Sequence, residues 1–294
     1  MNAENDRPAA MDAIFEQLDQ SDIASIKGVV SGVLQIISDP TSTAKNLKEI
    51  VEIDPPLTAR VLFLANSAHY APRIKILDIM QAIIFVGFDA IKELALSQKV
   101  ANIFQNGATV GGYSSEALWK HCLATALFTK MIYRREFRER GDNAYACGLL
   151  HDIGIIALQQ FMPEVFYRIL KTAEAENIAL TAAEKAALGF DHADLGRAIT
   201  EYWNFPEDIV QAIGAHHAPG QDPSRLAQTL FIADTVTRGN ELGYESRPAV
   251  EKALFQTCLN ELNINHQAVA LVLADVQKEI ANMETQGMLS YGNR

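Results

Sequence analysis

Residues 145–158 of the chain read YACGLLHDIGIIAL. This stretch contains one ionisable pair, His151 and Asp152, with apolar residues on both sides. Such a run is typical of a helical segment buried on most sides. A buried carboxylate without a partner is costly, whereas a metal ion or fixed hydrogen bonds would compensate it. The pair therefore indicates a binding site rather than simple packing.

Outward from this stretch, almost every segment between turn signals has the apolar periodicity of a helix, and no segment alternates long enough to predict a sheet. We therefore expect an all-α protein. The expected helices cover residues 12–38 (one or two helices), 43–51, 55–65, 76–86, 89–104, 118–137, 145–161, 163–176, 181–203, 206–217 and 225–239, followed by two C-terminal helices that end near residue 283.

A stretch rich in Gly and Ser at residues 107–116 is the clearest linker in the chain. It predicts two helical bundles of unequal size, an N-terminal bundle over residues 11–106 and a C-terminal helical domain over residues 117–283. The first residues, 1–10, and the polar tail, 284–294, are expected to be disordered or frayed.

Composition excludes several classes of protein. The 294 residues include 25 basic and 36 acidic side chains, and the resulting net charge of −11 opposes nucleic-acid binding. No apolar stretch reaches the roughly 20 residues that a bilayer requires, and the N-terminus carries no export signal. We expect a cytoplasmic protein without membrane contact. The three cysteines form no CxxC pair, which predicts buried free thiols.

Histidines give the clearest indication of chemistry. Five of the seven, His121, His151, His192, His216 and His217, lie between residues 121 and 217, and several have carboxylates beside them. Each one alone is explained by a hydrogen-bonded residue of the core. Together, imidazole nitrogens and carboxylate oxygens suit divalent ions such as Fe, Mn, Zn or Ni. The group therefore favours a metal site.

Motifs in both halves of the chain carry a family resemblance. The N-terminal half has Asp54 and Pro55, then LTARVLFLANSA at residues 57–68. The C-terminal half has LLHDIG at residues 149–154, GFDH at 189–192, WNFP at 203–206 and AHH at 215–217. From about residue 26 to 240 the chain resembles the HDOD family, the HD-related output domains of bacterial signalling proteins. The spacing of His121, His151–Asp152 and Asp234 is similar to the H…HD…D signature of the HD superfamily.

The resemblance implies an HDOD-specific helical subdomain followed by an HD-like helical domain, and one or two divalent ions, with Fe or Mn favoured over Zn or Ni. By similarity to the HD-GYP phosphodiesterases, His121, His151, Asp152 and Asp234 would surround one ion. His192, His216 and His217 would surround a second ion, which Asp152 could bridge. Glu184, eight residues before His192, is a candidate outer ligand.

Two departures bear on activity. Ile155 stands where the HD-GYP enzymes have a lysine, and the GYP loop is missing. The resemblance therefore implies a regulatory protein with a retained metal site that acts mainly on a signalling protein partner. The alternative is an active metal-dependent phosphohydrolase or phosphodiesterase on a nucleotide or other phosphate ester. A structural module with a vestigial site, and a homodimer, are both compatible with the sequence.

Overall fold

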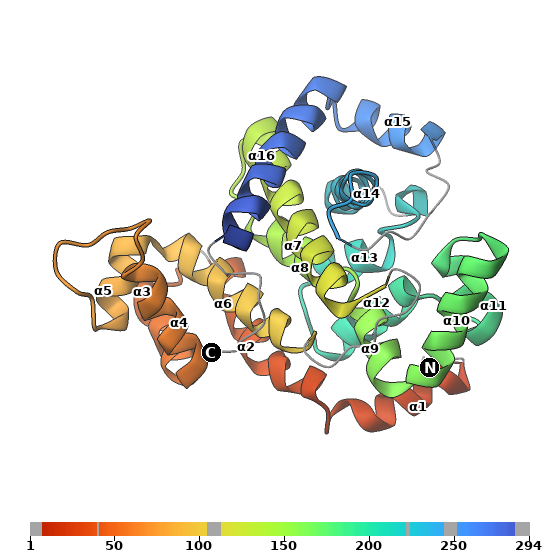
Figure 1. Cartoon of the computed structure of the whole chain (residues 1–294), viewed down its shortest axis with the longest axis horizontal. Helices are drawn as coiled ribbons and strands as arrows, with labels where there is room; N and C mark the ends of the chain where they lie inside the picture. Colours follow the sequence, from red (N-terminus) through yellow and green to blue (C-terminus); the bar gives the residue numbers. More distant parts are fainter. Residues whose placement is uncertain (1–7, 40, 105–112, 222–223, 244–251, 286–294) are drawn as a thin grey trace. The chain divides into compact units, whose positions relative to one another are not determined.

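The computed structural model of the protein describes residues 8–39, 41–104, 113–221, 224–243 and 252–285. Every element in these ranges is a helix, which confirms the all-α prediction (Figure 1). Most of the expected linker, residues 107–112, lies outside the described residues, as do residues 1–7 and 286–294 of the expected disordered ends.

The chain divides into two compact units. The smaller unit covers residues 25–102, and the larger one combines the N-terminal segment up to residue 24 with everything from residue 103 onward. Residues 11–24, which the linker position assigned to the N-terminal bundle, thus belong to the larger unit. There α1 (Ala9–Leu18) contacts α9 (Ile153–Phe161) and buries Ile14 and Leu18.

The smaller unit contains most of α2 (Asp22–Ser38), together with α3 (Ala44–Glu52), α4 (Pro55–Ala65), α5 (Ile79–Val86) and α6 (Phe88–Asn102). Asp54 caps α4, because its carboxylate accepts a hydrogen bond from the backbone N–H of Leu57 at 2.8 Å. Asn66 ends α4, and its side-chain amide bonds both the N–H and the C=O of Ile76 at 2.8 Å. This double contact ties the loop after α4 to the start of α5.

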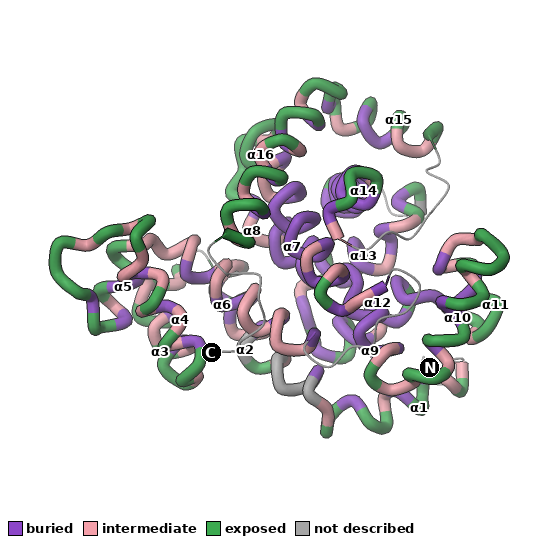
Figure 2. The backbone as a smooth tube through the Cα atoms, in the orientation of Figure 1, coloured by how far each residue is buried: buried purple, intermediate pink, exposed green. Residues whose placement is uncertain are grey.

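The larger unit continues with α7 (Ser115–Ile132), the π-helical turn η2 (Tyr133–Phe137), α8 (Asp142–Leu150), α9, α10 (Pro163–Glu176), α11 (Leu180–Leu188), α12 (His192–Tyr202), α13 (Glu207–Gly214), η3 (Pro219–Gln221), α14 (Arg225–Arg238), α15 (Lys252–Glu261) and α16 (His266–Thr285). Helix α7 contacts α8, α14 and α16, and it is buried along most of its length (Figure 2). The core of this unit therefore surrounds α7 and α14.

Two segments predicted as single helices are broken in the structure. The 145–161 segment divides into α8 and α9 at His151 and Asp152. The 181–203 segment divides into α11 and α12, because Gly189 takes a left-handed conformation and Asp191 then caps α12 through the backbone N–H of Asp194. Both breaks place candidate ligands at helix ends, where their side chains can converge.

Candidate metal centre

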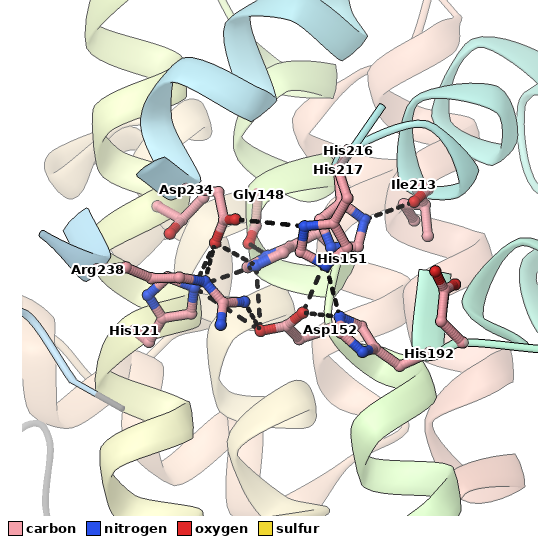
Figure 3. A network of polar contacts seen from close by, with 12 residues as sticks. His121, Gly148, His151, Asp152, His192, Ile213, His216, His217, Asp234 and Arg238 are labelled. Atoms are coloured by element: carbon pink, nitrogen blue, oxygen red, sulfur yellow. Dashed lines mark hydrogen bonds and ion pairs between the residues drawn. The ribbon is translucent and has the colours of Figure 1, made fainter. Parts of the chain in front are cut away.

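Seven side chains predicted as metal ligands lie together in the larger unit (Figure 3). His121 lies on α7, His151 and Asp152 join α8 to α9, His192 begins α12, His216 and His217 follow α13, and Asp234 lies on α14. Six of these side chains are buried, and His217 is 28% exposed. Segments far apart in the sequence thus bring nitrogen and oxygen donors to one enclosed position.

The first cluster consists of His121, His151 and Asp234. Nε2 of His121 lies 2.8 Å from Oδ1 of Asp234 and 3.2 Å from Nε2 of His151. Nε2 of His151 also lies 3.4 Å from Oδ1 of Asp234. Oδ2 of Asp152 borders this cluster, at 3.2 Å from Nε2 of His151.

The second cluster consists of Asp152, His192, His216 and His217. The other carboxylate oxygen of Asp152, Oδ1, lies 3.3 Å from Nε2 of His192 and 3.6 Å from Nε2 of His216. Nε2 of His217 lies 2.8 Å from Nε2 of His192. Asp152 therefore faces both clusters, one oxygen toward each.

Outer hydrogen bonds fix how the imidazole rings present their inner nitrogens. Nδ1 of His151 donates to the carbonyl of Gly148 at 2.8 Å, and Nδ1 of His216 donates to the carbonyl of Ile213 at 2.6 Å. Nδ1 of His192 donates to Oε2 of Glu184 at 2.7 Å, and the same oxygen accepts the backbone N–H of His192 at 3.0 Å. Since each outer nitrogen donates a proton, each ring turns its inner nitrogen toward the clusters, and that nitrogen offers a lone pair to a metal when the ring is neutral. Glu184 thus orients His192 from outside.

Two atoms of the second cluster that could bind a metal ion have no hydrogen-bond partner. Oδ1 of Asp152 and Nε2 of His216 are buried, and neither has a hydrogen-bond partner. A buried acceptor left unpaired costs roughly 1–3 kcal/mol, so each such atom requires an explanation. A cation between these atoms would satisfy both, and imidazole with carboxylate is a donor set that divalent transition metals accept. The residues present therefore fit a divalent ion.

Arg238 is part of the same network, although no motif in the sequence identifies it. Its guanidinium is buried, donating from Nε to Oδ1 of Asp234 at 2.6 Å and from Nη2 to Oδ2 of Asp152 at 2.9 Å. The available sequence signal is its position four residues after Asp234, on the same face of α14. That spacing indicates the pair with Asp234 but says nothing of Asp152.

Charges in the network shift the titration of its members. Burial alone would raise the pKa of Asp152 and of Asp234, but Arg238 and the neighbouring histidines hold both well below the usual range. Burial would lower the pKa of His151 and of His192, yet the adjacent carboxylates raise these values to about 9 and about 10. Both carboxylates are therefore ionised at neutral pH.

The family model described as the HDOD domain matches residues 23–219, well over half of the chain. The chain belongs to the HDOD family. The H…HD…D arrangement of the HD superfamily is present in this HDOD protein as the cluster of His121, His151, Asp152 and Asp234.

Solved structures resemble this HDOD protein over most of its length. An HDOD domain protein of unknown function from Geobacter sulfurreducens is 23% identical, with a TM-score of 0.74 over 93% of this chain and 96% of that one. A structure from Shewanella amazonensis SB2B, provisionally named a phosphohydrolase, is 22% identical, with a TM-score of 0.66 over 96% and 97% of the two chains. At these identities the likeness establishes the fold.

A curated relative, an uncharacterized protein from Treponema pallidum (strain Nichols), is 24% identical over 246 residues. The match covers 80% of the HDOD protein and 46% of the relative, so this chain spans about half the length of that relative. Within the described ranges, no helix has the length and apolar character needed to cross a bilayer.

One glycine beside the site permits a close approach of two helix ends. A Cβ at Gly154, in the first turn of α9, would overlap the backbone carbonyl of His192 at the start of α12. Only glycine lets these two backbones meet. The contact sets the separation of Asp152 and His192, the two residues that α9 and α12 bring to the second cluster.

All three cysteines are free and buried, as predicted. Cys122 lies near His151 and Asp152. Burial, reinforced by the charge of Asp152, raises the pKa of Cys122 well above its ordinary value, so the group is a neutral thiol. A protonated thiol is a weak ligand, which leaves the histidines and carboxylates as the donors of this site.

Proposed function

We propose that this HDOD protein is a regulatory protein of signal transduction that contains a divalent-metal centre and acts mainly through contacts with a signalling protein. The observation that carries the proposal is the second cluster, in which Asp152 Oδ1 and His216 Nε2 are buried without a hydrogen-bond partner. Three imidazoles and one carboxylate would hold one ion there. This mixture of nitrogen and oxygen donors suits Fe or Mn and also accepts Zn or Ni.

The cluster is placed to stabilise the larger unit. Its residues come from the α8–α9 junction, the start of α12 and the turn after α13. An ion shared by these segments would join the three helix ends. Because binding to the folded state alone adds stability, metal content would control how firmly this unit is folded.

Exposed apolar side chains supply a candidate surface for a partner. Among the large apolar side chains found exposed in the described residues, six belong to the smaller unit: Ile53, Phe63, Ile74, Leu77, Ile84 and Phe85. Ile74 is 83% exposed and Ile84 is 74% exposed. Apolar residues concentrated in this way are typical of a protein contact surface. The unit without the metal centre is therefore the one that we assign to partner binding.

The test uses a deletion strain of the source organism. We expect a double variant, Ile74→Asp with Ile84→Asp, to fail to restore the signalling phenotype while its metal content and melting temperature stay those of the wild type. The matched control is Leu271→Asp, which places the same charge at a 57% exposed apolar position of α16, and it should restore the phenotype. Full rescue by the double variant would contradict the proposal.

Phosphohydrolase activity is the second candidate function. It is favoured by the 28% exposure of His217, through which the second cluster meets solvent. A bound divalent ion would supply activation of water and of a phosphate oxygen. Ile155 is fully buried, so the position that carries a lysine in the HD-GYP enzymes offers no charge here. Turnover of a phosphate-ester panel by Mn- or Fe-loaded protein, absent after chelation, would establish this activity in place of a purely regulatory role.

A further inference from the structure

We propose that Arg238 takes the place of a metal ion beside the first cluster, so that this protein binds a single divalent ion, in the second cluster. The inference rests on the proposed metal centre and deepens it. Of the two predicted ion positions, the second cluster would hold an ion. The guanidinium of Arg238 would supply the positive charge at the first.

The oxygens that face the first cluster already have a cation. Oδ1 of Asp234 accepts from Nε of Arg238 at 2.6 Å, and Oδ2 of Asp152 accepts from Nη2 of Arg238 at 2.9 Å. The guanidinium thus joins both carboxylates, as a metal ion shared between them would. Charge-assisted hydrogen bonds of this length are among the strong ones in proteins.

The inner nitrogen of His121 is already in contact with other ligands of the first cluster. Nε2 of His121 lies 2.8 Å from Oδ1 of Asp234 and 3.2 Å from Nε2 of His151. An ion entering the first cluster would have to separate these side chains. His216 shows the opposite arrangement, because its Nδ1 donates to the carbonyl of Ile213 and its Nε2 is left without a partner.

Burial and the ion pair with Asp234 fix the position of the Arg238 side chain. This side chain is 4% exposed, and it lies on α14 four residues after Asp234, with which it forms a pair along one helix face. Withdrawing the guanidinium would leave two buried carboxylates without their cation, a change that strongly destabilises other proteins. An ion entering the first cluster would have to displace this group.

Like charges also oppose a second ion. The guanidinium of Arg238 is buried and contacts both Asp152 and Asp234. A divalent ion in the first cluster would lie beside this cation in a buried position, which is unfavourable.

The test counts ions. Purified protein is dialysed to equilibrium against Mn²⁺, and bound manganese is measured by elemental analysis and by electron paramagnetic resonance. We expect one ion for each wild-type chain, with the spectrum of an isolated Mn²⁺. Two ions for each chain, or a spin-coupled pair, would overturn the inference and leave the proposed metal centre standing. No bound ion would overturn the metal centre itself, which separates the two failures.

Substitutions at two histidines and at Arg238 test separately which cluster binds the ion. His121→Gln should keep one ion, whereas His216→Gln should lose it, and both replace a fully buried histidine. Loss of the ion in His121→Gln, with the protein still folded, would contradict the inference. Arg238→Met should bind two ions, and Arg238→Lys, which keeps the charge, should bind one. If Arg238→Met does not fold, the two histidine variants still decide the question.

Discussion

Arg238 and Asp152 are 86 positions apart in the sequence, and Nη2 of Arg238 donates to Oδ2 of Asp152 at 2.9 Å. This bond leaves the other oxygen of Asp152 directed at His192 and His216. The guanidinium therefore fixes which way the bridging carboxylate faces. It also ties α14 to the α8–α9 junction inside the core of the larger unit.

Replacing Asp152 with alanine should destabilise the protein strongly. The change leaves Arg238 buried with one carboxylate fewer, and breaking a buried charge pair costs about 3–5 kcal/mol. We expect a loss of this size in the free energy of unfolding, measured by chemical denaturation in the presence of a chelator. The double variant Asp152→Ala with Arg238→Met should lose less than the sum of the two single changes, because the unpaired charge is gone. If the losses in unfolding free energy of the two single variants add exactly in the double variant, Asp152 and Arg238 are not energetically coupled.

Replacing Gly154 with alanine should disturb the centre without changing any ligand. Its Cβ would overlap the carbonyl of His192, so α9 and α12 must separate and move Asp152 away from His192. We expect a loss of about 1–3 kcal/mol in the free energy of unfolding and a weaker affinity for Mn²⁺. Gly220→Ala is the control, since a Cβ there meets nothing within 4 Å. Equal behaviour of the two variants would disprove the role of this close approach.

Glu184 acts on the metal through His192. Its Oε2 accepts both the Nδ1 proton and the backbone N–H of His192, so Glu184→Gln should leave the ligand in place but less well oriented and less basic. Outer partners of this kind contribute about 10–100-fold to metal affinity, and we expect a loss in that range in the affinity of the neutral His192 ring, obtained from equilibrium dialysis over a series of pH values. Glu176→Gln, an exposed change at the end of the neighbouring α10, should have no effect.

Metal affinity should increase with pH. The charge of Glu184 raises the pKa of His192 to about 10 against the opposing effect of burial, so at neutral pH a proton occupies the nitrogen that the ion needs. His216 and His217 have pKa values lowered by burial and bind without losing a proton. Because one proton is displaced, the dissociation constant should fall about tenfold for each pH unit between pH 6 and 8. Free Mn²⁺ measured by electron paramagnetic resonance reports this constant directly.

The variant Glu184→Gln checks the cause of that pH dependence. Without the carboxylate, the pKa of His192 is lower and the proton competes less, so the dependence on pH should become shallower. An affinity that is independent of pH in the wild type would show that His192 is not protonated, or is not a ligand.

The helical fold could be predicted from the sequence, because apolar periodicity is a local property of the chain. The candidate ligands could be chosen because their residue types and their order match the H…HD…D signature. The helix break at His151 and Asp152 could not be predicted, since the apolar residues on both sides include no proline or capping residue that would mark a helix end. Arg238 follows Asp234 by one helical turn, which is readable, but its bond to Asp152 depends on tertiary packing. The assignment of α1 to the larger unit likewise depends on a contact with α9, far along the chain.

The most direct test of the metal centre is anomalous X-ray diffraction from crystals grown with Mn²⁺ and measured at the manganese edge. We expect one anomalous peak, bounded by Oδ1 of Asp152 and the imidazoles of His192, His216 and His217. A Mn²⁺-equilibrated crystal with no peak at these four side chains would show that the second cluster is not a metal centre.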